Sequence, residues 1–180
     1  MQMDIDLETA KALGFPKSAY TVVEHERRWL CREVPREKVT LTETITDLYV
    51  AGSRLRLREA RPVDGRPARL RLSRKADIDA RTRLVTSIYL PEEEFALLAA
   101  CLPGRRIEKL RHRLQSPTGI VLSVDQFQGV LEGLMMLEAE FDSVELMTDF
   151  AVPAFALREV TDDPRYSGGE LALHGLPEIR

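Results

Sequence analysis

Residues 22–30 have the sequence VVEHERRWL, whose alternation indicates a β-strand with one charged face. Side chains alternate across a strand, so residues two apart lie on the same face. Glu24, Glu26 and Arg28 therefore share one face. The opposite face carries the remaining side chains, Val23, His25, Arg27 and Trp29.

Four later stretches repeat the charged alternation. Residues 54–58 (RLRLR), 69–75 (RLRLSRK) and 109–113 (KLRHR) each align basic side chains, whereas residues 134–140 (LMMLEAE) align acidic ones. The basic side chains that share a face within these stretches are Arg54, Arg56, Arg58, Arg69, Arg71, Lys75, Lys109, Arg111 and Arg113. The acidic pair is Glu138 and Glu140.

A single strand of this type is ordinary in a half-buried sheet with ion pairs on its solvated side. Five such strands, with acids in the first and last and bases between, instead favour a closed sheet whose charged faces point inward. Unpaired buried charges cost several kcal/mol each, so such an interior requires water, metal ions and a polyanion. Carboxylates suit a hard cation, Mg²⁺ or Mn²⁺, and Arg and Lys suit phosphate oxygens.

The whole chain predicts a mainly β (α+β) fold. Turn signals such as Ala51-Gly52-Ser53 separate eight strand-like stretches. These are residues 21–31, 38–50, 54–60, 68–75, 84–90, 107–114, 119–127 and 133–141. Helices are expected over residues 7–13, from Pro91 to Cys101, and around residues 170–174. Eight strands with few helices predict an eight-stranded antiparallel closed β-barrel, and the 180-residue length fits one domain over residues 1–180.

Composition excludes several classes of protein. The net charge of −3 argues against a general nucleic-acid binder. No apolar run reaches membrane-spanning length, and the acidic N-terminus lacks the charge pattern of a secretory signal, so we expect a cytoplasmic protein that does not bind a membrane. Arg makes up 21 of the 26 basic residues, which GC-rich coding mostly explains. Cys31 and Cys101 have no metal-ligand spacing, and we expect buried free thiols while leaving a disulfide open.

Beginning at Glu24-His25-Glu26-Arg27-Arg28, the sequence resembles the CYTH superfamily, the triphosphate tunnel metalloenzymes, whose N-terminal strand carries Glu-x-Glu-x-Lys. Further motifs match in the family's order. They are RLR at 56–58, LSRK at 72–75, PEEEF at 91–95, KLR at 109–111, VDQFQG at 124–129, GLMMLEAE at 133–140 and REVTDDPRY at 158–166. Each motif is weak alone, but their common order over residues 22–166 is specific.

The resemblance implies an eight-stranded tunnel, a small-molecule triphosphate as partner, and Mg²⁺ or Mn²⁺ as cofactor. It implies catalytic roles for Glu24, Glu26 and Arg28. It implies metal ligation by Glu24, Glu26, Asp125, Glu138 and Glu140, and phosphate binding by Arg56, Arg58, Lys75, Lys109 and Arg111. Arg28 departs from the family's Lys. An arginine can hold phosphate but does not deprotonate, so any proton-transfer role of the lysine would be lost.

The leading functional prediction is metal-dependent hydrolysis of inorganic triphosphate or a simple organic triphosphate. The alternatives are a class IV-type adenylate cyclase, a thiamine triphosphatase, or a non-catalytic polyphosphate- or nucleotide-binding module. Trp29 lies on the face opposite Glu24 and Glu26, which favours packing over stacking on a substrate. The sequence leaves open a homodimer, the number of metal ions and the physiological substrate.

Overall fold

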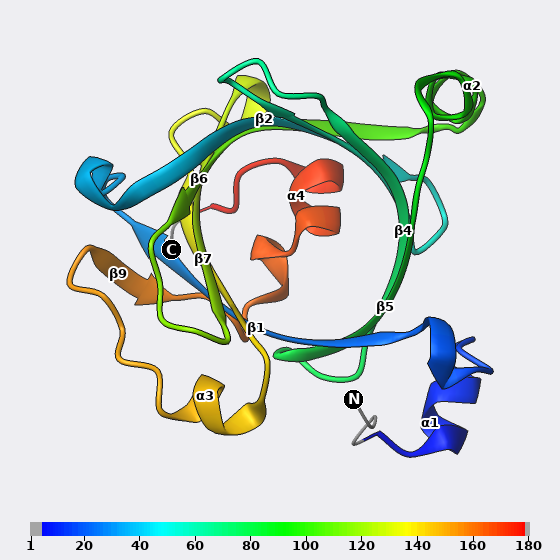
Figure 1. Ribbon diagram of the computed structural model, residues 1–180, viewed down its shortest axis with the longest axis horizontal. Helices are drawn as coiled ribbons and strands as arrows, with labels where there is room; N and C mark the ends of the chain where they lie inside the picture. The colour runs from blue at the N-terminus through cyan, green and yellow to red at the C-terminus, as the bar shows by residue number, and fades with distance from the viewer. Residues whose placement is uncertain (1–4, 179–180) are drawn as a thin grey trace.

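The computed structural model describes residues 5–178, and its centre is a closed antiparallel barrel (Figure 1). The order around the barrel is β5-β4-β3-β2-β6-β7-β8-β1, and β1 pairs with β5 to close it. The eight strands are β1 (Val22–Cys31), β2 (Val39–Val50), β3 (Leu55–Pro62), β4 (Arg69–Asp77), β5 (Thr82–Tyr89), β6 (Gly104–Leu114), β7 (Ile120–Phe127) and β8 (Met135–Phe141). A ninth strand, β9 (Ala156–Glu159), pairs with the end of β1 beyond β5.

The helices are short and peripheral. They are α1 (Leu7–Ala12), α2 (Glu92–Cys101), α3 (Val144–Thr148) and α4 (Gly168–His174), with 3-10 turns at Ser18–Tyr20, Arg36–Lys38, Gly129–Leu131 and Pro164–Tyr166. Asp6 caps α1 by accepting hydrogen bonds from two backbone amides. Three glutamates occupy the first turn of α2, where their negative charge interacts favourably with the helix dipole. None of the helices in residues 5–178 is long and apolar enough to cross a membrane.

The structure confirms the predicted fold class and all eight predicted strands. Two boundaries differ in a way that matters for the interior. β5 begins at Thr82 and so includes Arg83, and β6 begins at Gly104, three residues before its predicted start. Two elements, α3 and β9, were not predicted, because each is only four or five residues long and has no clear periodicity.

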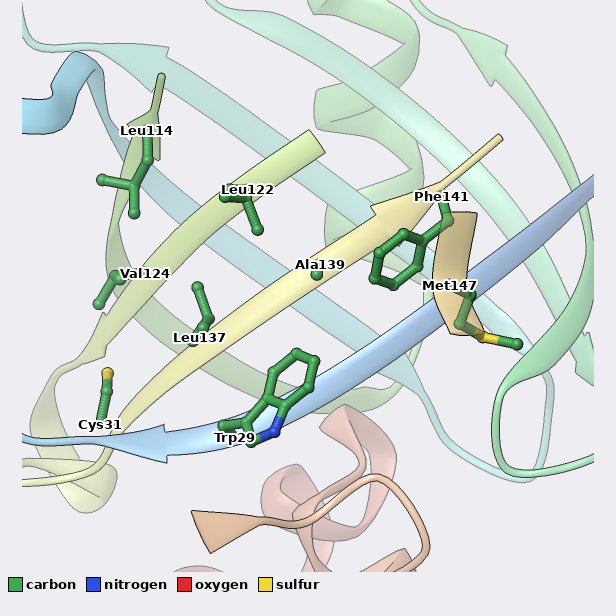
Figure 2. Packing of buried hydrophobic residues seen from close by; sticks show 9 residues of the cluster. All are labelled: Trp29, Cys31, Leu114, Leu122, Val124, Leu137, Ala139, Phe141 and Met147. Atoms are coloured by element: carbon green, nitrogen blue, oxygen red, sulfur yellow. The ribbon is translucent and has the colours of Figure 1, made fainter. Parts of the chain in front are cut away.

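The main apolar core lies outside the barrel wall. The side chains that alternate with the charged ones on β1, β6, β7 and β8 form one cluster (Figure 2), made of Trp29, Cys31, Leu114, Leu122, Val124, Leu137, Ala139 and Phe141, with Met147 from α3. The chain after β8 covers this cluster, and the ring of Phe150 lies 5.6 Å from Trp29 and 5.2 Å from Phe141. The predicted packing role of Trp29 is confirmed, since it is 2% exposed.

Two further clusters complete the packing. Ala10 and Phe15, in and after α1, pack on the outer side of Ala76 and Leu84. At one end of the barrel, α4 lies across the opening (Figure 1) and packs against inward-facing apolar side chains. This end cluster contains Ile107, Phe127, Leu131, Leu134, Met136, Val160, Tyr166 and Leu171. This apolar plug therefore covers part of one end of the barrel, and the interior beyond it is lined by charged side chains.

Both cysteines are free thiols, but the expectation of burial is wrong for one of them. Cys31 is buried in the outer cluster, where burial and the charge of Asp125 raise its pKa to about 12. Cys101 is exposed, because α2 lies on the barrel surface and buries none of its residues.

Replacing Leu137 with Ala should lower the free energy of unfolding by about 2–5 kcal/mol, because Leu137 is fully buried in the outer cluster and the deletion leaves a cavity. The same replacement at Leu97, which is 64% exposed, is the control and should change stability by less than about 0.5 kcal/mol. Urea unfolding of both variants checks this. Equal losses would contradict the placement of the core outside the barrel.

Candidate active site

A cavity of about 120 Å³ runs through the charged part of the barrel interior. Ten of the eleven sequence-predicted site residues line it: Glu24, Glu26, Arg28, Arg56, Arg58, Lys75, Lys109, Arg111, Glu138 and Glu140. They come from β1, β3, β4, β6 and β8, so the structure brings together the acidic and basic faces identified along the chain. The interior is a narrow polar channel rather than a packed core.

Two fully buried aspartates hold four of the basic side chains in place. Asp47 on β2 accepts two hydrogen bonds of 2.6 Å from Arg58, and Arg56 lies 3.5 Å away. Asp125 on β7 likewise accepts two bonds of 2.6 Å from Arg111 and a further bond from Lys109. Paired forks of this kind fix a guanidinium in one orientation. These four basic side chains are thus held in place before any ligand binds.

The pairing accounts for the ionisation of Asp47. Burial alone would raise its pKa, but the adjacent Arg58 and Arg56 guanidiniums hold the pKa of Asp47 far below the usual range. Asp125 was predicted as a metal ligand. The structure places it against Lys109 and Arg111, because strand register sets Asp125 directly opposite Arg111 on the neighbouring strand. Its role as a metal ligand stays a prediction.

Three carboxylates gather on the opposite wall. Glu26, Glu138 and Glu140 each offer an oxygen, and these three atoms lie within 4.8 Å of one another. We call this group the carboxylate trio. Glu26 and Glu140 are directly opposite on β1 and β8, as are Arg28 and Glu138, so the trio follows from the pairing of those two strands.

The members of the trio differ in electrostatic surroundings. Burial, followed by the nearby Glu24 and Glu26 carboxylates, raises the pKa of Glu140. Burial acts in the same direction on Glu138, but Arg111 and then Lys109 outweigh it and lower the pKa of Glu138 well below its usual value. Negative charge is therefore uncompensated at Glu140, which is the position where a cation would be most stabilising.

Glu24 is not in the trio. Its Oε2 accepts a hydrogen bond of 2.6 Å from Lys75 Nζ. Burial acts to raise the pKa of Glu24, yet Lys75 and then Arg83 lower it overall. The structure therefore separates the four expected glutamates into three that lie together and one that is paired with a lysine.

Arg28 is held by the C-terminal segment. Its Nη1 donates to the backbone carbonyl of Tyr166 at 3.0 Å, its backbone N–H donates to the hydroxyl of Thr161 at 2.9 Å, and its Nε lies 3.3 Å from Glu26. This segment starts with β9 and ends in the plug helix α4. The chain after β8 thus positions a residue in the channel as well as covering the outer core.

The channel opens near α4 into a larger cavity of about 500 Å³. Tyr49, Arg56, Lys75 and Arg83 line both spaces. Gly168, the first residue of α4, lies so close to Tyr49 that an added Cβ would fall 1.9 Å from the Tyr49 hydroxyl oxygen. The glycine at position 168 therefore permits close packing at the mouth of the channel.

Sequence reasoning missed several residues of the channel. Asp47 and Tyr49 share the inner face of β2, and the alternation Glu43, Ile45, Asp47, Tyr49 within the predicted strand could have revealed them. Arg83, which lies 3.0 Å from Glu26, fell just before the predicted start of its strand. Arg71 and Arg113 also line the channel; both were placed on basic faces but received no role.

Comparison with known proteins supports the resemblance that the ordered sequence motifs indicated. An inorganic triphosphatase of Nitrosomonas europaea is 37% identical over 86 residues, which are 48% of this chain and 57% of that protein. An inorganic triphosphatase of Acetivibrio thermocellus is 42% identical over 65 residues, 36% of this chain and 40% of its own length. The chain thus spans about half the length of the curated relatives it matches. No protein-family model matches the sequence.

The crystal structure of an inorganic triphosphatase is similar over 84% of this chain and 95% of its own, with a TM-score of 0.56 and 27% identity. The two curated relatives carry the same name, inorganic triphosphatase. These similarities support the CYTH superfamily as the group that the chain resembles. The resemblance drawn from the ordered motifs is therefore confirmed.

The residues present fit the divalent metal that the superfamily implies. The trio offers three hard oxygen donors at a spacing that one cation can bridge, which suits Mg²⁺ or Mn²⁺. The raised pKa of Glu140 reflects a concentration of negative charge that a cation would relieve. Opposite, Arg56 Nη2 is buried without a hydrogen-bond partner in the part of the chain that the structure describes, which suits an anionic ligand.

Replacing Glu140 with Gln should raise the free energy of unfolding of the metal-free protein at pH 7. A carboxyl whose pKa is higher in the folded state than the unfolded value near 4.5 binds its proton more tightly when folded, so its ionised form destabilises the fold. This destabilisation is absent below pH 4.5, appears as the pH rises through the folded pKa, and persists at neutral pH. Urea unfolding in EDTA at pH 4 and pH 7 measures it.

The exposed Glu132 provides the control, since Glu132→Gln should have no comparable effect. Added Mg²⁺ should then stabilise the wild type more than Glu140→Gln, because the variant has lost a charged ligand. A variant that is less stable than the wild type at pH 7 without metal would show that Glu140 is already compensated by its neighbours.

Proposed function

We propose that this protein is a divalent-metal-dependent triphosphatase that cleaves a phosphoanhydride bond of inorganic triphosphate. One observation carries the proposal: the carboxylate trio and a row of anchored basic side chains face each other across the same narrow channel. The two curated relatives and the similar crystal structure, all inorganic triphosphatases, support it. A module that only binds anions would gain nothing from three clustered carboxylates.

The basic side chains would hold the phosphate chain. Phosphoryl transfer depends mainly on positioning and charge neutralisation. Arg58 and Arg111, each held by a buried aspartate, present their remaining N–H groups without reorientation. Within residues 5–178, Arg56 contributes a buried donor that has no hydrogen-bond partner. Donors fixed in advance avoid the cost of reorganisation when charge develops during the reaction.

Glu26, Glu138 and Glu140 would hold Mg²⁺ or Mn²⁺. When bound, the ion would supply Lewis-acid stabilisation of charge on the phosphate oxygens. Glu24 would act differently from the other three glutamates: through its hydrogen bond it fixes the ammonium of Lys75 toward the channel. In this proposal Asp125 orients Lys109 and Arg111 and does not ligate metal.

Arg28 would hold a phosphate group and would not move a proton. Its guanidinium stays charged at any working pH, and the carbonyl of Tyr166 and the carboxylate of Glu26 fix its orientation. A water molecule attacking the terminal phosphorus must therefore lose its proton to another group. The carboxylates of Glu26 and Glu138 lie beside Arg28 in the channel and are the bases available to accept this proton.

The channel favours an inorganic chain over an organic triphosphate. Most of its lining in the described residues is charged, and its aromatic members are Tyr49 and Phe127. Phe127 belongs to the apolar plug, and Tyr49 packs against Gly168. An organic group would have to remain in the larger outer cavity, whose lining within residues 5–178 has no aromatic ring besides Tyr49.

Phosphate release should be fastest from inorganic triphosphate, slower from ATP and thiamine triphosphate, and abolished by EDTA. The physical reason is that only a bare phosphate chain can place all of its oxygens against the channel's basic side chains. A phosphate-release assay with Mg²⁺ and with Mn²⁺ compares the three substrates. Formation of cyclic AMP and diphosphate from ATP without phosphate release would instead establish the cyclase alternative.

Replacing Glu138 with Gln should lower kcat for inorganic triphosphate by about 100-fold or more, since loss of even an indirect metal contact costs 10–100-fold. Glu93→Gln on the exposed surface of α2 is the matched control and should be unchanged. Circular dichroism would confirm that both variants fold. Full activity in Glu138→Gln would refute the proposed role of the trio.

A further inference from the structure

Three arginines separate the channel from a second, smaller cavity of about 60 Å³. Arg58, Arg71 and Arg113 line both spaces. On β6 the inward side chains run from Ile107 in the apolar plug through Lys109 and Arg111 to Arg113, so this cavity lies at the end of the barrel opposite α4. We call it the rear cavity. Its volume exceeds that needed for a single water molecule and admits a small ion.

The rear cavity opens to solvent between two exposed side chains. Tyr89 is 69% exposed and the side chain of Arg69 is 53% exposed. Glu43, which is fully buried, accepts a hydrogen bond of 2.5 Å from Arg69 and lies 3.6 Å from Arg113. Glu43 thus orients two arginine side chains at the opening, in the same way that Asp47 orients Arg58 deeper in the barrel.

Arg71 is the exception to this pairing. Every other basic side chain that lines the channel lies within 4.0 Å of a carboxylate. Within residues 5–178, Arg71 has neither an ion pair nor a side-chain hydrogen bond, although it is partly buried and directly opposite Arg58 on β3. Burial and then the positive charges of Arg58 and Arg56 lower its pKa. The protein therefore holds an uncompensated cation between the channel and the rear opening.

We propose that Arg71, with Arg58 and Arg113, forms an orthophosphate site at the rear cavity. A tetrahedral anion can accept hydrogen bonds from several guanidiniums at once, and it supplies the negative charge that Arg71 lacks. The proposal rests on the proposed function for the source of the ion. Attack of water on a terminal phosphorus breaks the bond to the bridging oxygen, which leaves with diphosphate, and the new orthophosphate is the product small enough for this cavity.

Binding of inorganic phosphate tests the site without requiring catalysis. Isothermal titration calorimetry in EDTA should show binding to the wild type, about tenfold weaker binding to Arg71→Gln, and an intermediate value for Arg71→Lys, which keeps the charge but loses the fork. Arg66→Gln is the matched control, because Arg66 is exposed on the turn between β3 and β4. Unchanged affinity in Arg71→Gln, or no binding to the wild type, would overturn the proposal.

Product inhibition provides a second measurement. Orthophosphate should inhibit triphosphate hydrolysis noncompetitively, since it binds beside the substrate and not in its place, and Arg71→Gln should raise the inhibition constant about tenfold with less than about a twofold change in KM. Purely competitive inhibition that is insensitive to Arg71 would overturn the site. Phosphate binding through Arg71 in a protein that does not hydrolyse triphosphate would refute the proposed function alone.

Discussion

Charge pairing inside a closed barrel is the constraint on which this structure depends. Removing one partner of a buried pair leaves an uncompensated charge that costs several kcal/mol. Asp47 and Asp125 meet this constraint for four basic side chains, Arg56, Arg58, Lys109 and Arg111. Each aspartate lies on a strand adjacent to its arginine partner, so strand register positions the pair directly. The two aspartates make it possible to line a narrow space with guanidiniums and still fold without a ligand.

A charged interior moves the stabilising core elsewhere. Because side chains alternate, the inward charges on β1 and β8 are interleaved with outward side chains, of which Trp29, Leu137 and Ala139 are apolar and must be covered. The chain after β8 provides that cover through α3 and Phe150. It continues through β9 to Tyr166, whose carbonyl orients Arg28. The segment that stabilises the outside of the barrel is therefore the one that completes the site inside it.

Alternation in the sequence was sufficient to identify the faces, since a strand assigns each side chain to one side or the other. Ten channel residues were predicted in this way together with the family motifs. Alternation cannot reveal which charges become partners. Glu24 pairs with Lys75 from two strands away, a contact that depends on the closure of β1 against β5. Asp125 faces Arg111, a contact that depends on the register of β6 and β7.

Short elements and surface burial were the other limits of sequence reasoning. β9 has four residues, too few for a period to emerge, and its position depends on pairing with β1. Cys101 follows an apolar run that suggests burial. In the structure α2 packs on β4 on the outside of the barrel and buries none of its residues. The sequence of α2 does not distinguish this exposed position from a buried one.

The two places where like charges remain together suggest how the channel distinguishes its ligands. Glu140 lies among carboxylates, which raise its pKa, and Arg71 lies among guanidiniums, which lower its pKa. Each position destabilises the empty protein and each is relieved by an ion of opposite sign. A cation alone would leave the excess at Arg71, and an anion alone would leave the excess at Glu140. In our proposals, a metal at the carboxylate trio together with orthophosphate at the rear cavity would relieve both charges, so the two uncompensated positions favour a protein that holds both ions over one that holds either alone.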